Sequence, residues 1–506
     1  MKVSLFIILT IITSVCYKEV KCFNILAVFP YEGETHFLVF THYLQELARR
    51  GHNVTVISPF PRKTPMENYH DIQLYHDKRK KESGLSFPMF EPTYILRLNV
   101  FKLVLTIGYD NCKELLESKH VQDLWKSQTK FDVVVVEQFN TDCPLGLAYK
   151  IGAPVVGIST TSLMPHHYDR FGIPQNPSYT SFLGLEGGTY PNILQRFERI
   201  FFKIMTPFVR FISQKFDEYT LAQYFDDLPP LEELARNIKI LLLYQYTVLS
   251  GSSLLPANVI EVGGFHVTNP KPLPEELRKF IEESEHGVIY VSFGTNLNTN
   301  TLPAKTLESI ISVLSSLPQR IIWKWNGDIP TKDSDFYFAK WIPQNDLLAH
   351  PNVVAFFSHC GNLGITEAIH HGVPVLGMPF IADQPSVAAA VEKSGLGVQI
   401  QMSEVTKDKL LNKFSIILQP NFRENVKILS KSWHDRPISP MDNAIFWTEF
   451  AANYPNVTLR SRSADVPFYE YLCLDILAIM VLIIYNSFYL VNFLLVFLFT
   501  KKQKLH

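Results

Sequence analysis

Residues 353–384 constrain the fold more than any other stretch of the chain. An apolar run, Val353–Phe357, ends in a turn that contains Gly361 and Gly364, and helical sequence follows until Gly372. Glycines at such a turn leave the backbone N–H groups at the helix start open to an anion, which the helix dipole also favours. The pattern predicts a strand, turn and helix of a parallel sheet, with a phosphate site at the turn.

Polar side chains suited to a nucleotide sugar accompany this turn. Glu367 lies within the expected helix, close enough to its start to reach a ribose beside the phosphate. Asp383 and Gln384 follow the next apolar run, 373–378. They therefore lie at the edge where open parallel sheets bind their ligands. A carboxylate and an amide at that edge suit the hydroxyl groups of a sugar.

The same residues carry a resemblance to a known family. Trp341-Ile342-Pro343-Gln344 is followed at fixed spacing by Ser358-His359-Cys360-Gly361 and then by the run HGVPVLGMPFIADQ. This series strongly resembles the nucleotide-sugar signature of the UDP-glycosyltransferases, and the resemblance extends over nearly the whole chain. Residues 136–139 and 262–266 resemble insect members more than vertebrate ones.

The resemblance implies an α/β fold with two facing Rossmann-like domains, the GT-B arrangement. It implies inverting transfer of a sugar, expected to be glucose, from a UDP-sugar to a small lipophilic acceptor, without a metal ion or other cofactor. Trp341 would stack on the uracil, Gln344 would hydrogen-bond its edge, and Glu367 would hold the ribose. The other residues expected at the UDP-sugar site are Gly294, Thr295, Ile342, His359, Gly361, Gly364, Asp383 and Gln384.

Two positions depart from the signature of the family. Cys360 stands where a glycine is usual, and we expect it to keep the turn with a negative φ. Leu363 stands where vertebrate relatives have an asparagine that contacts phosphate. Only backbone amides remain available at that point, which allows donor affinity or sugar preference to differ from those relatives.

The mature chain begins with a β-α-β pattern that carries a histidine. Apolar runs at 24–29 and 53–58 flank a helical pattern over 35–50, which predicts parallel strands. His36 falls at the start of that helix, beyond the carboxyl end of the first strand, where it faces the crevice. In the family a histidine at this place removes the proton of the acceptor, and an aspartate at a second strand end is its partner.

Two carboxylates compete for the role of partner to His36. Glu137 is the first polar residue after the apolar run 131–136, at the same edge of the sheet, where the family usually has aspartate. Asp142 lies five residues later and, with Pro144 after it, is also typical of a helix N-cap. We favour Glu137, and both remain candidates.

The two ends of the chain indicate a membrane-anchored protein of the secretory pathway. Residues 1–22 have the pattern of a cleaved signal peptide. Residues 476–499 are uncharged and long enough to span a bilayer, and the lysines that follow place residues 500–506 in the cytosol. We therefore expect a single-pass type I protein of the endoplasmic reticulum membrane, with glycosylation at Asn456 and, less favoured because of its predicted buried strand, Asn53.

Between these ends we expect four segments. They are an acceptor-binding domain at 23–255, a linker at 256–275, a UDP-sugar-binding domain at 276–460 and a juxtamembrane segment at 461–475. The basic amphipathic stretch 194–219 would either lie on a membrane face or roof the acceptor pocket, and both imply a hydrophobic acceptor.

Charge and cysteine content exclude other functions. A net charge of −1 offers no basic footprint for nucleic acid. Three cysteines, Cys112, Cys143 and Cys360, fall in the expected lumenal part, and this odd number predicts no disulfide framework. No His/Cys cluster has metal-ligand spacing, and we expect the Asp-Ser-Asp at 333–335 to be a solvated loop. Homo-oligomerisation is left open.

Overall fold

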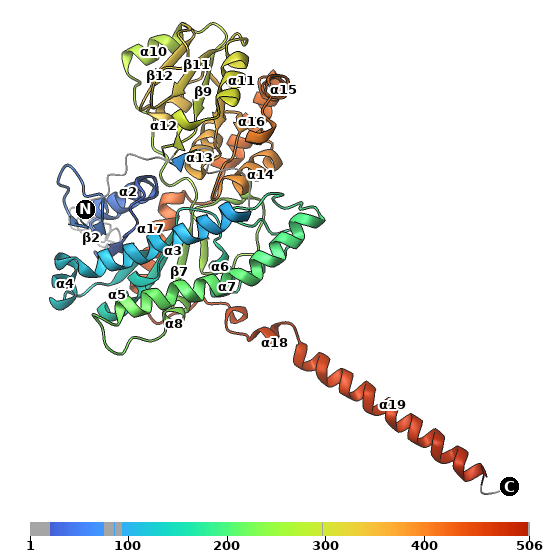
Figure 1. The fold of residues 1–506 in the computed structure, drawn as a ribbon. Coiled ribbons are helices and arrows are strands. Elements are labelled where there is room, and N and C mark those ends of the chain that lie inside the picture. Colours follow the sequence, from blue (N-terminus) through green and yellow to red (C-terminus); the bar gives the residue numbers. More distant parts are fainter. Residues whose placement is uncertain (1–20, 75–84, 87–93, 296, 504–506) are drawn as a thin grey trace, which may run out of the picture.

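The chain folds around two β-sheets (Figure 1). The computed structural model describes residues 21–74, 85–86, 94–295 and 297–503. A seven-stranded sheet has the order β3-β2-β1-β5-β6-β7-β8, and a six-stranded sheet has the order β12-β11-β9-β13-β14-β15. All neighbouring strands in both sheets run parallel. The predicted α/β class with two parallel-sheet domains is confirmed.

The first sheet is built from short, strongly apolar strands, of which the valine run at 133–136 is typical because β-branched residues favour a pleated, buried surface. Its strands are β1 (Asn24–Val28), β2 (Asn53–Ser58), β3 (Tyr69–Gln73), β5 (Val133–Glu137), β6 (Val155–Ser159), β7 (Ile240–Leu243) and β8 (Val259–Glu261). Its helices are α2 (Glu34–Arg49), α3 (Tyr94–Glu117), α4 (Lys119–Lys126), α5 (Cys143–Ile151), α6 (Pro165–Phe171), α7 (Ile193–Leu221), α8 (Leu231–Arg236) and α9 (Thr247–Ser250).

The second sheet includes the strand, turn and helix predicted within residues 353–384. Its strands are β9 (Val288–Ser292), β11 (Arg320–Lys324), β12 (Phe336–Ala339), β13 (Val353–Ser358), β14 (Val375–Gly377) and β15 (Gly397–Gln399). Its helices are α10 (Glu275–Glu282), η2 (Thr299–Thr301), α11 (Ala304–Leu314), α12 (Gln344–Leu348), α13 (Asn362–His371), α14 (Gln384–Ser394), η3 (Met402–Glu404), α15 (Lys407–Ile417) and α16 (Pro420–His434). A small parallel pair, β4 (Leu85–Ser86) with β10 (Leu297–Asn298), joins the two parts of the chain.

Helix α17 (Pro440–Asn453) returns from the second domain to the first. Ala444, Ile445 and Ala451 are buried in the same apolar cluster as residues of β1 and α2. The hydroxyls of Tyr43 and Thr448, one from each side of this contact, are 2.6 Å apart. The C-terminal helical segment therefore crosses back over the first domain.

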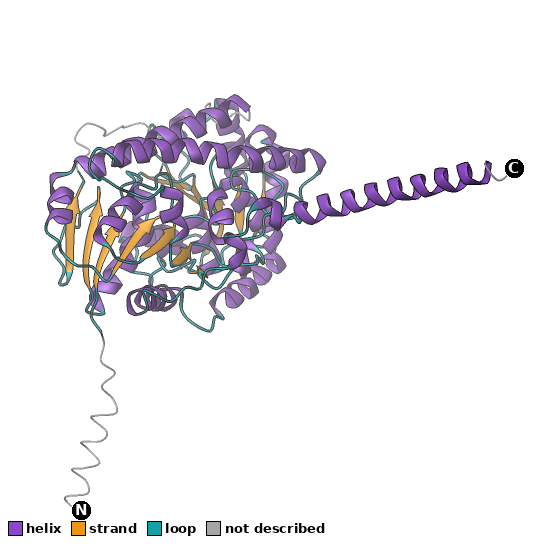
Figure 2. Cartoon of the chain, turned by 90° about the horizontal axis from the view of Figure 1, so that it is seen from below, coloured by secondary structure: helices purple, strands orange, loops and turns teal. Residues whose placement is uncertain are grey.

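The chain ends in a long apolar helix that projects from the body (Figure 2). After η4 (Arg462–Ala464) and α18 (Phe468–Tyr471), helix α19 covers Leu474–Gln503. Its segment Leu474–Leu498 is long and apolar enough to cross a membrane, close to the predicted 476–499. Residues 1–20 of the predicted signal peptide and 504–506 of the predicted cytosolic tail lie outside the described residues.

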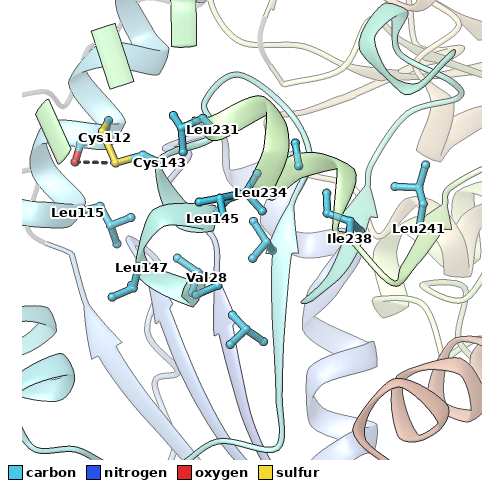
Figure 3. Packing of buried hydrophobic residues seen from close by; sticks show 14 of the residues in the cluster. Val28, Cys112, Leu115, Cys143, Leu145, Leu147, Leu231, Leu234, Ile238 and Leu241 are labelled. Carbon is cyan, nitrogen blue, oxygen red and sulfur yellow. Dashed lines mark hydrogen bonds between the residues drawn. A yellow bond between two sulfur atoms is a disulfide. The ribbon is translucent and has the colours of Figure 1, made fainter. Parts of the chain in front are cut away.

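A disulfide joins Cys112, near the end of α3, to Cys143, the first residue of α5 (Figure 3). Both cysteines are fully buried among leucines of the first core. The expectation of no disulfide was wrong because it rested on an odd count. Cys360 is buried alone in the second domain, so the two cysteines of the first domain form a pair.

Candidate active site between the two sheets

His36 and Glu137 meet at the carboxyl edge of the first sheet. His36 lies in the first turn of α2 and Glu137 is the last residue of β5. Nδ1 of His36 is 3.1 Å from Oε1 of Glu137 and 3.1 Å from the hydroxyl of Thr160, just after β6. An ionised carboxylate only accepts hydrogen bonds, so Nδ1 carries the proton and Nε2 keeps its lone pair. This tautomer is the one that can accept a proton from a substrate at Nε2.

Asp142 does not lie beside His36. It occupies the N-cap position of α5, as its sequence context predicted, but its side chain makes no capping bond. The buried carboxylate instead forms ion pairs with Arg170 and Arg210 and accepts a hydrogen bond from Gln214. Burial alone would raise the pKa of Asp142, but the two arginines outweigh it and hold the pKa below its ordinary value. The alternative pairing of Asp142 with His36 is therefore not what the structure shows.

Aromatic rings surround the imidazole of His36. The ring of Tyr31 lies 4.8 Å from it and the ring of Phe139 lies 4.6 Å from it, centroid to centroid. Burial, with Glu137 adding to it, raises the pKa of Tyr31 to about 12, so its phenol stays protonated at neutral pH. Aromatic rings thus line the approach to His36, with Glu137 and Thr160 at Nδ1 and the carboxylate of Asp383 in the second domain interacting with it electrostatically.

In the second domain His359 is packed between two glycine turns. A Cβ atom at Gly294 would lie 2.7 Å from Nε2 of His359, and one at Gly361 would lie 2.5 Å from it. Both positions therefore need glycine for this histidine to fit. Burial, reinforced by the positive charge of Lys324, lowers the pKa of His359 to about 4. Thr295, beside the first of these turns, is exposed.

The turn before α13 has a geometry that we did not expect at Cys360. Its φ is +63°, in the left-handed region that favours glycine, rather than negative. The buried thiol fills the space over Gly377, where a Cβ would lie 2.4 Å from Sγ. Packing of the sulfur in the core thus holds a backbone conformation that the glycine of the family adopts more easily.

The carboxylate of Glu367 has neighbouring side chains on two sides. Nε2 of Gln344 donates to its carboxylate at 2.5 Å, while the phenol of Tyr290 donates to Oε1 of Gln344 at 3.0 Å. On the other side, Nε2 of His266 lies 3.6 Å from Glu367, and Nδ1 of His266 is hydrogen-bonded to the phenol of Tyr244. His266 was noted from the sequence only because residues 262–266 resemble insect members, and its contact with Glu367 was not expected. Gly364 permits the arrangement, because a Cβ there would lie 3.0 Å from Nε2 of Gln344.

Trp341 and Ile342 are adjacent but differ in exposure. The indole of Trp341 is 67% exposed, whereas Ile342 is buried in the core and offers only its backbone to a ligand. Nζ of Lys324 lies 4.9 Å from the centre of the Trp341 ring. Lys324 ends β11 at the ligand edge and was not among the expected site residues. The rule that singled out Glu137, a polar residue closing an apolar strand, would have found it.

Asp383 and Gln384 lie at the start of α14 and differ in which of their polar groups remain available to a ligand. The carbonyl of the Gln384 side chain accepts hydrogen bonds from the backbone N–H groups of Phe380 and Ile381, at 2.8 and 3.0 Å. Only its NH₂ group is left for a ligand, so this amide can donate a hydrogen bond to a sugar but not accept one. Burial raises the pKa of Asp383 to about 6, and His36 of the other domain opposes this rise.

The two domains touch through the N-terminal turn of α13. The side-chain NH₂ of Asn362 donates to the carbonyls of Thr160 and Tyr244 in the first domain, at 3.3 and 3.1 Å. Leu363, next to it, packs against the core cluster of the first domain. The position where relatives carry a phosphate-contacting asparagine thus serves interdomain packing here. Thr160 joins Asn362 to His36, so the sites of the two domains adjoin.

A cavity of about 510 Å³ lies between the domains, with Asn362 in its wall. Its lining mixes aromatic and apolar side chains, Tyr168, Tyr190, Tyr246, Leu249 and Trp433 among them, with polar ones. His36 does not line this cavity, but it is linked to the wall through Thr160 and Asn362.

Three other sequence expectations can be compared with the structure. Asn53 is exposed at the start of β2 rather than buried, and it donates to the side chain of Asn24, while Asn456 is exposed after α17. The Asp333–Asp335 loop is solvated, with Asp335 paired to Arg320. Within the described part of the chain, no group of three or more His, Cys, Asp or Glu side chains is placed to hold a metal ion.

Comparison with known proteins identifies the family of the chain. A family model for "UDP-glucoronosyl and UDP-glucosyl transferase" matches residues 24–505. UDP-glucosyltransferase 2 of Dactylopius coccus is 32% identical and covers 90% of this chain and 89% of its own. UDP-glycosyltransferase UGT5 of the same insect is 33% identical over 95% of this chain and 92% of its own.

A mammalian protein and a solved structure are similar as well. UDP-glucuronosyltransferase 2A3 of Cavia porcellus is 29% identical over 90% of both chains. Among solved structures, the spinosyn forosaminyltransferase SpnP superposes with a TM-score of 0.58 at 16% identity, over 86% of this chain and all of its own, which establishes the GT-B fold. The chain belongs to the family of UDP-glucuronosyl and UDP-glucosyl transferases, enzymes that transfer a sugar from a UDP-sugar.

Proposed function

We propose that the protein is an inverting, metal-independent glucosyltransferase that moves glucose from UDP-glucose to a lipophilic hydroxyl compound such as a phenol. The observation that carries this proposal is the pairing of His36 with Glu137, which leaves Nε2 free at the edge facing the second domain. The assignment of residues 23–255 to the acceptor and 276–460 to the donor, with 256–275 as linker, is part of the proposal.

In this reaction Nε2 of His36 takes the proton of the acceptor hydroxyl as its oxygen attacks the anomeric carbon. The bond between that carbon and the diphosphate breaks, and UDP leaves with the electron pair. Glu137 stabilises the imidazolium that forms, because its carboxylate accepts the hydrogen bond from Nδ1. Attack from the side opposite to UDP turns an α-linked donor into a β-linked product.

Negative charge grows on the diphosphate as it leaves. Without a metal ion, hydrogen-bond donors and cations of the protein must stabilise this charge. A His359 whose pKa is lowered to about 4 is neutral at pH 7, so it serves as a hydrogen-bond donor rather than as a cation. The N–H groups around Gly361 and Gly364, the hydroxyl of Thr295 and the ammonium of Lys324 complete this set. Trp341, Gln344 and Glu367 are assigned to the uracil and ribose.

We propose that Asp383 and Gln384 bind the sugar of the donor and select glucose. The carboxylate accepts hydrogen bonds from neighbouring hydroxyls and the amide NH₂ of Gln384 donates one. A glucuronate would place a second carboxylate beside Asp383 and would need a cation there. Lys340 and Lys393 of the same domain are exposed, and Nζ of Lys393 lies over the ring of Tyr190. The insect relative named as a UDP-glucosyltransferase supports the same choice.

Transfer rates with UDP-glucose, UDP-galactose, UDP-N-acetylglucosamine and UDP-glucuronic acid at equal concentration test the donor. We expect UDP-glucose to be used fastest, and Asp383→Asn to lower its rate by more than about tenfold. Preference for UDP-glucuronic acid would refute the donor assignment. Binding of UDP-glucose without any release of UDP across a phenolic acceptor panel would favour a non-catalytic binder instead.

We further propose that the catalytic domains lie in the lumen of the endoplasmic reticulum, anchored by α19. The buried disulfide between Cys112 and Cys143 supports an oxidising compartment. Asn456 and Asn53 are both exposed and both sit in sequons, so both are proposed glycan sites.

A further inference from the structure

Helix α7 (Ile193–Leu221) is amphipathic, but its apolar face is exposed and its polar face is buried. This is the reverse of a helix on the surface of a water-soluble protein. Helix α7 crosses the front of the first domain in Figure 1, and its outward side chains are apolar. Phe197 is 75% exposed and Ile204 68%, and Phe208 and Phe211 are also more than half exposed. These side chains recur at intervals of seven, four and three residues, so they form one stripe along the helix. At 1.5 Å per residue the helix is about 43 Å long.

The inward face of α7 is polar. Arg199 is fully buried and its guanidinium donates to the carbonyls of Thr180, Glu186 and Gly188, at 2.8–2.9 Å. Farther along, the side chain of Asp217 accepts a hydrogen bond from the backbone N–H of Asp142 at 2.8 Å.

Gln214 and Arg210 also bind Asp142 from this inward face. These contacts fix the rotation of α7 at both ends. The apolar stripe faces outward because of this register, and turning it inward would leave buried charges unpaired.

The charges on the exposed side of α7 have one sign. Its exposed charged side chains are Arg196, Lys203 and Lys215, of which Lys215 pairs with the half-buried Glu218, and its other acidic residues are buried or half-buried. Basic side chains interleaved with large aromatic ones match a bilayer surface, where acyl chains accept the rings and phosphate groups accept the cations.

The chain leading to the membrane anchor is fixed to the helices that pack against α7. Helices α6 and α8 both contact α7. The hydroxyl of Ser463 in η4 donates to the carbonyl of Gly172 at the end of α6, and Arg460 donates to the carbonyls of Arg170 in α6 and Arg236 in α8.

Nine residues lie between Ala464 in η4 and Leu474, where α19 begins, so this layer lies within about 35 Å of the membrane entry point. Figure 1 shows α19 leaving the body on the side of α7 and α8. The exposed aromatic residues of α18, Phe468 and Tyr469 among them, continue the apolar surface toward the anchor.

We propose that the outward stripe of α7 lies in the headgroup region of the same bilayer that α19 crosses. The protein then touches the membrane at two places, a spanning helix and an interfacial helix. This inference goes beyond the transfer reaction and does not depend on which sugar or acceptor is used.

The test uses the full chain in nanodiscs of phosphatidylcholine and phosphatidylserine that contain a phospholipid with a diazirine on its acyl chain near the glycerol. After irradiation, mass spectrometry maps the lipid adducts. We expect adducts on the α7 stripe as well as on α19, and none at Leu411 and Ile428, exposed apolar residues of α15 and α16 in the second domain. Adducts on α19 without any on α7 would overturn the proposal, as would equal labelling of α16.

Two matched variants sharpen the result. Ile204→Glu on α7 and Ile428→Glu on α16 each replace an exposed isoleucine, 68% and 59% exposed respectively. We expect Ile204→Glu to remove lipid adducts from the middle of α7, and Ile428→Glu to leave the adduct map unchanged. If Ile204→Glu fails to fold, the adduct map of the unaltered protein decides alone. In a parallel sample treated with a bifunctional protein cross-linker, links between the α7 helices of two chains, together with no lipid adducts on α7, would show that a second copy covers the stripe and would refute the proposal.

Discussion

Replacing Glu137 by glutamine tests the assignment of the catalytic pair. The amide keeps the size of the side chain but loses the charge that stabilises a protonated His36, 3.1 Å away. A hydrogen bond to a charged group contributes about 1.5–3 kcal/mol, and each factor of ten in rate corresponds to about 1.4 kcal/mol. We therefore expect kcat for glucosyl transfer to fall by about tenfold to about 150-fold, with the KM for UDP-sugar nearly unchanged.

The control is the rival carboxylate. Asp142→Asn breaks a buried ion pair with Arg170 and Arg210, and removing one partner of such a pair costs about 3–5 kcal/mol of stability. Its effect should appear in thermal unfolding, while the molecules that remain folded turn over at close to the normal rate. Glu137→Asp keeps the charge and should retain more activity than Glu137→Gln.

The assay is kcat and KM for both substrates, together with the unfolding midpoint of each variant. The reasoning fails if Glu137→Gln keeps full turnover. It also fails if Asp142→Asn slows turnover as much as Glu137→Gln does without lowering the unfolding midpoint.

Three further outcomes are expected. Replacing Cys112 and Cys143 by alanine opens a crosslink over 31 residues, and denaturant unfolding should show a loss of about 3–4 kcal/mol; an unchanged midpoint would contradict this. Because burial raises the pKa of Asp383 to about 6, its carboxylate is charged above that pH and protonated below it, so the KM for UDP-glucose should rise as pH falls through about 6. Asp383→Asn should remove that pH dependence, and its persistence would assign it to another group. Protease added to sealed microsomes should remove only the tail after about Thr500, and cleavage of the domain that carries His36 would overturn the lumenal orientation.

Much of the architecture follows from local patterns in the sequence. Apolar runs followed by turns and helical spacing predict the strands of both sheets. The first polar residue after such a run lies at the ligand edge of a parallel sheet. This rule placed Glu137 beside His36, and it applies equally to Lys324, where it was not used.

Contacts between distant segments could not be predicted in this way. The pairing of Cys112 with Cys143 depends on how α3 packs against the start of α5, which residue counting does not reveal. The bond from Gln384 to its own turn and the position of His266 beside Glu367 depend on side-chain directions. The φ of Cys360 is set by the packing of its thiol against Gly377, a tertiary effect that overrides the local preference for glycine.

The central claim is that a base in the first domain acts on a sugar donor held by the second. Titration of His36→Ala with UDP-glucose, followed by a transfer assay on the same preparation, tests it most directly. We expect donor affinity close to that of the unaltered protein and transfer lowered by about 10²–10⁴-fold. Near-normal transfer, or loss of donor binding together with transfer, would contradict it.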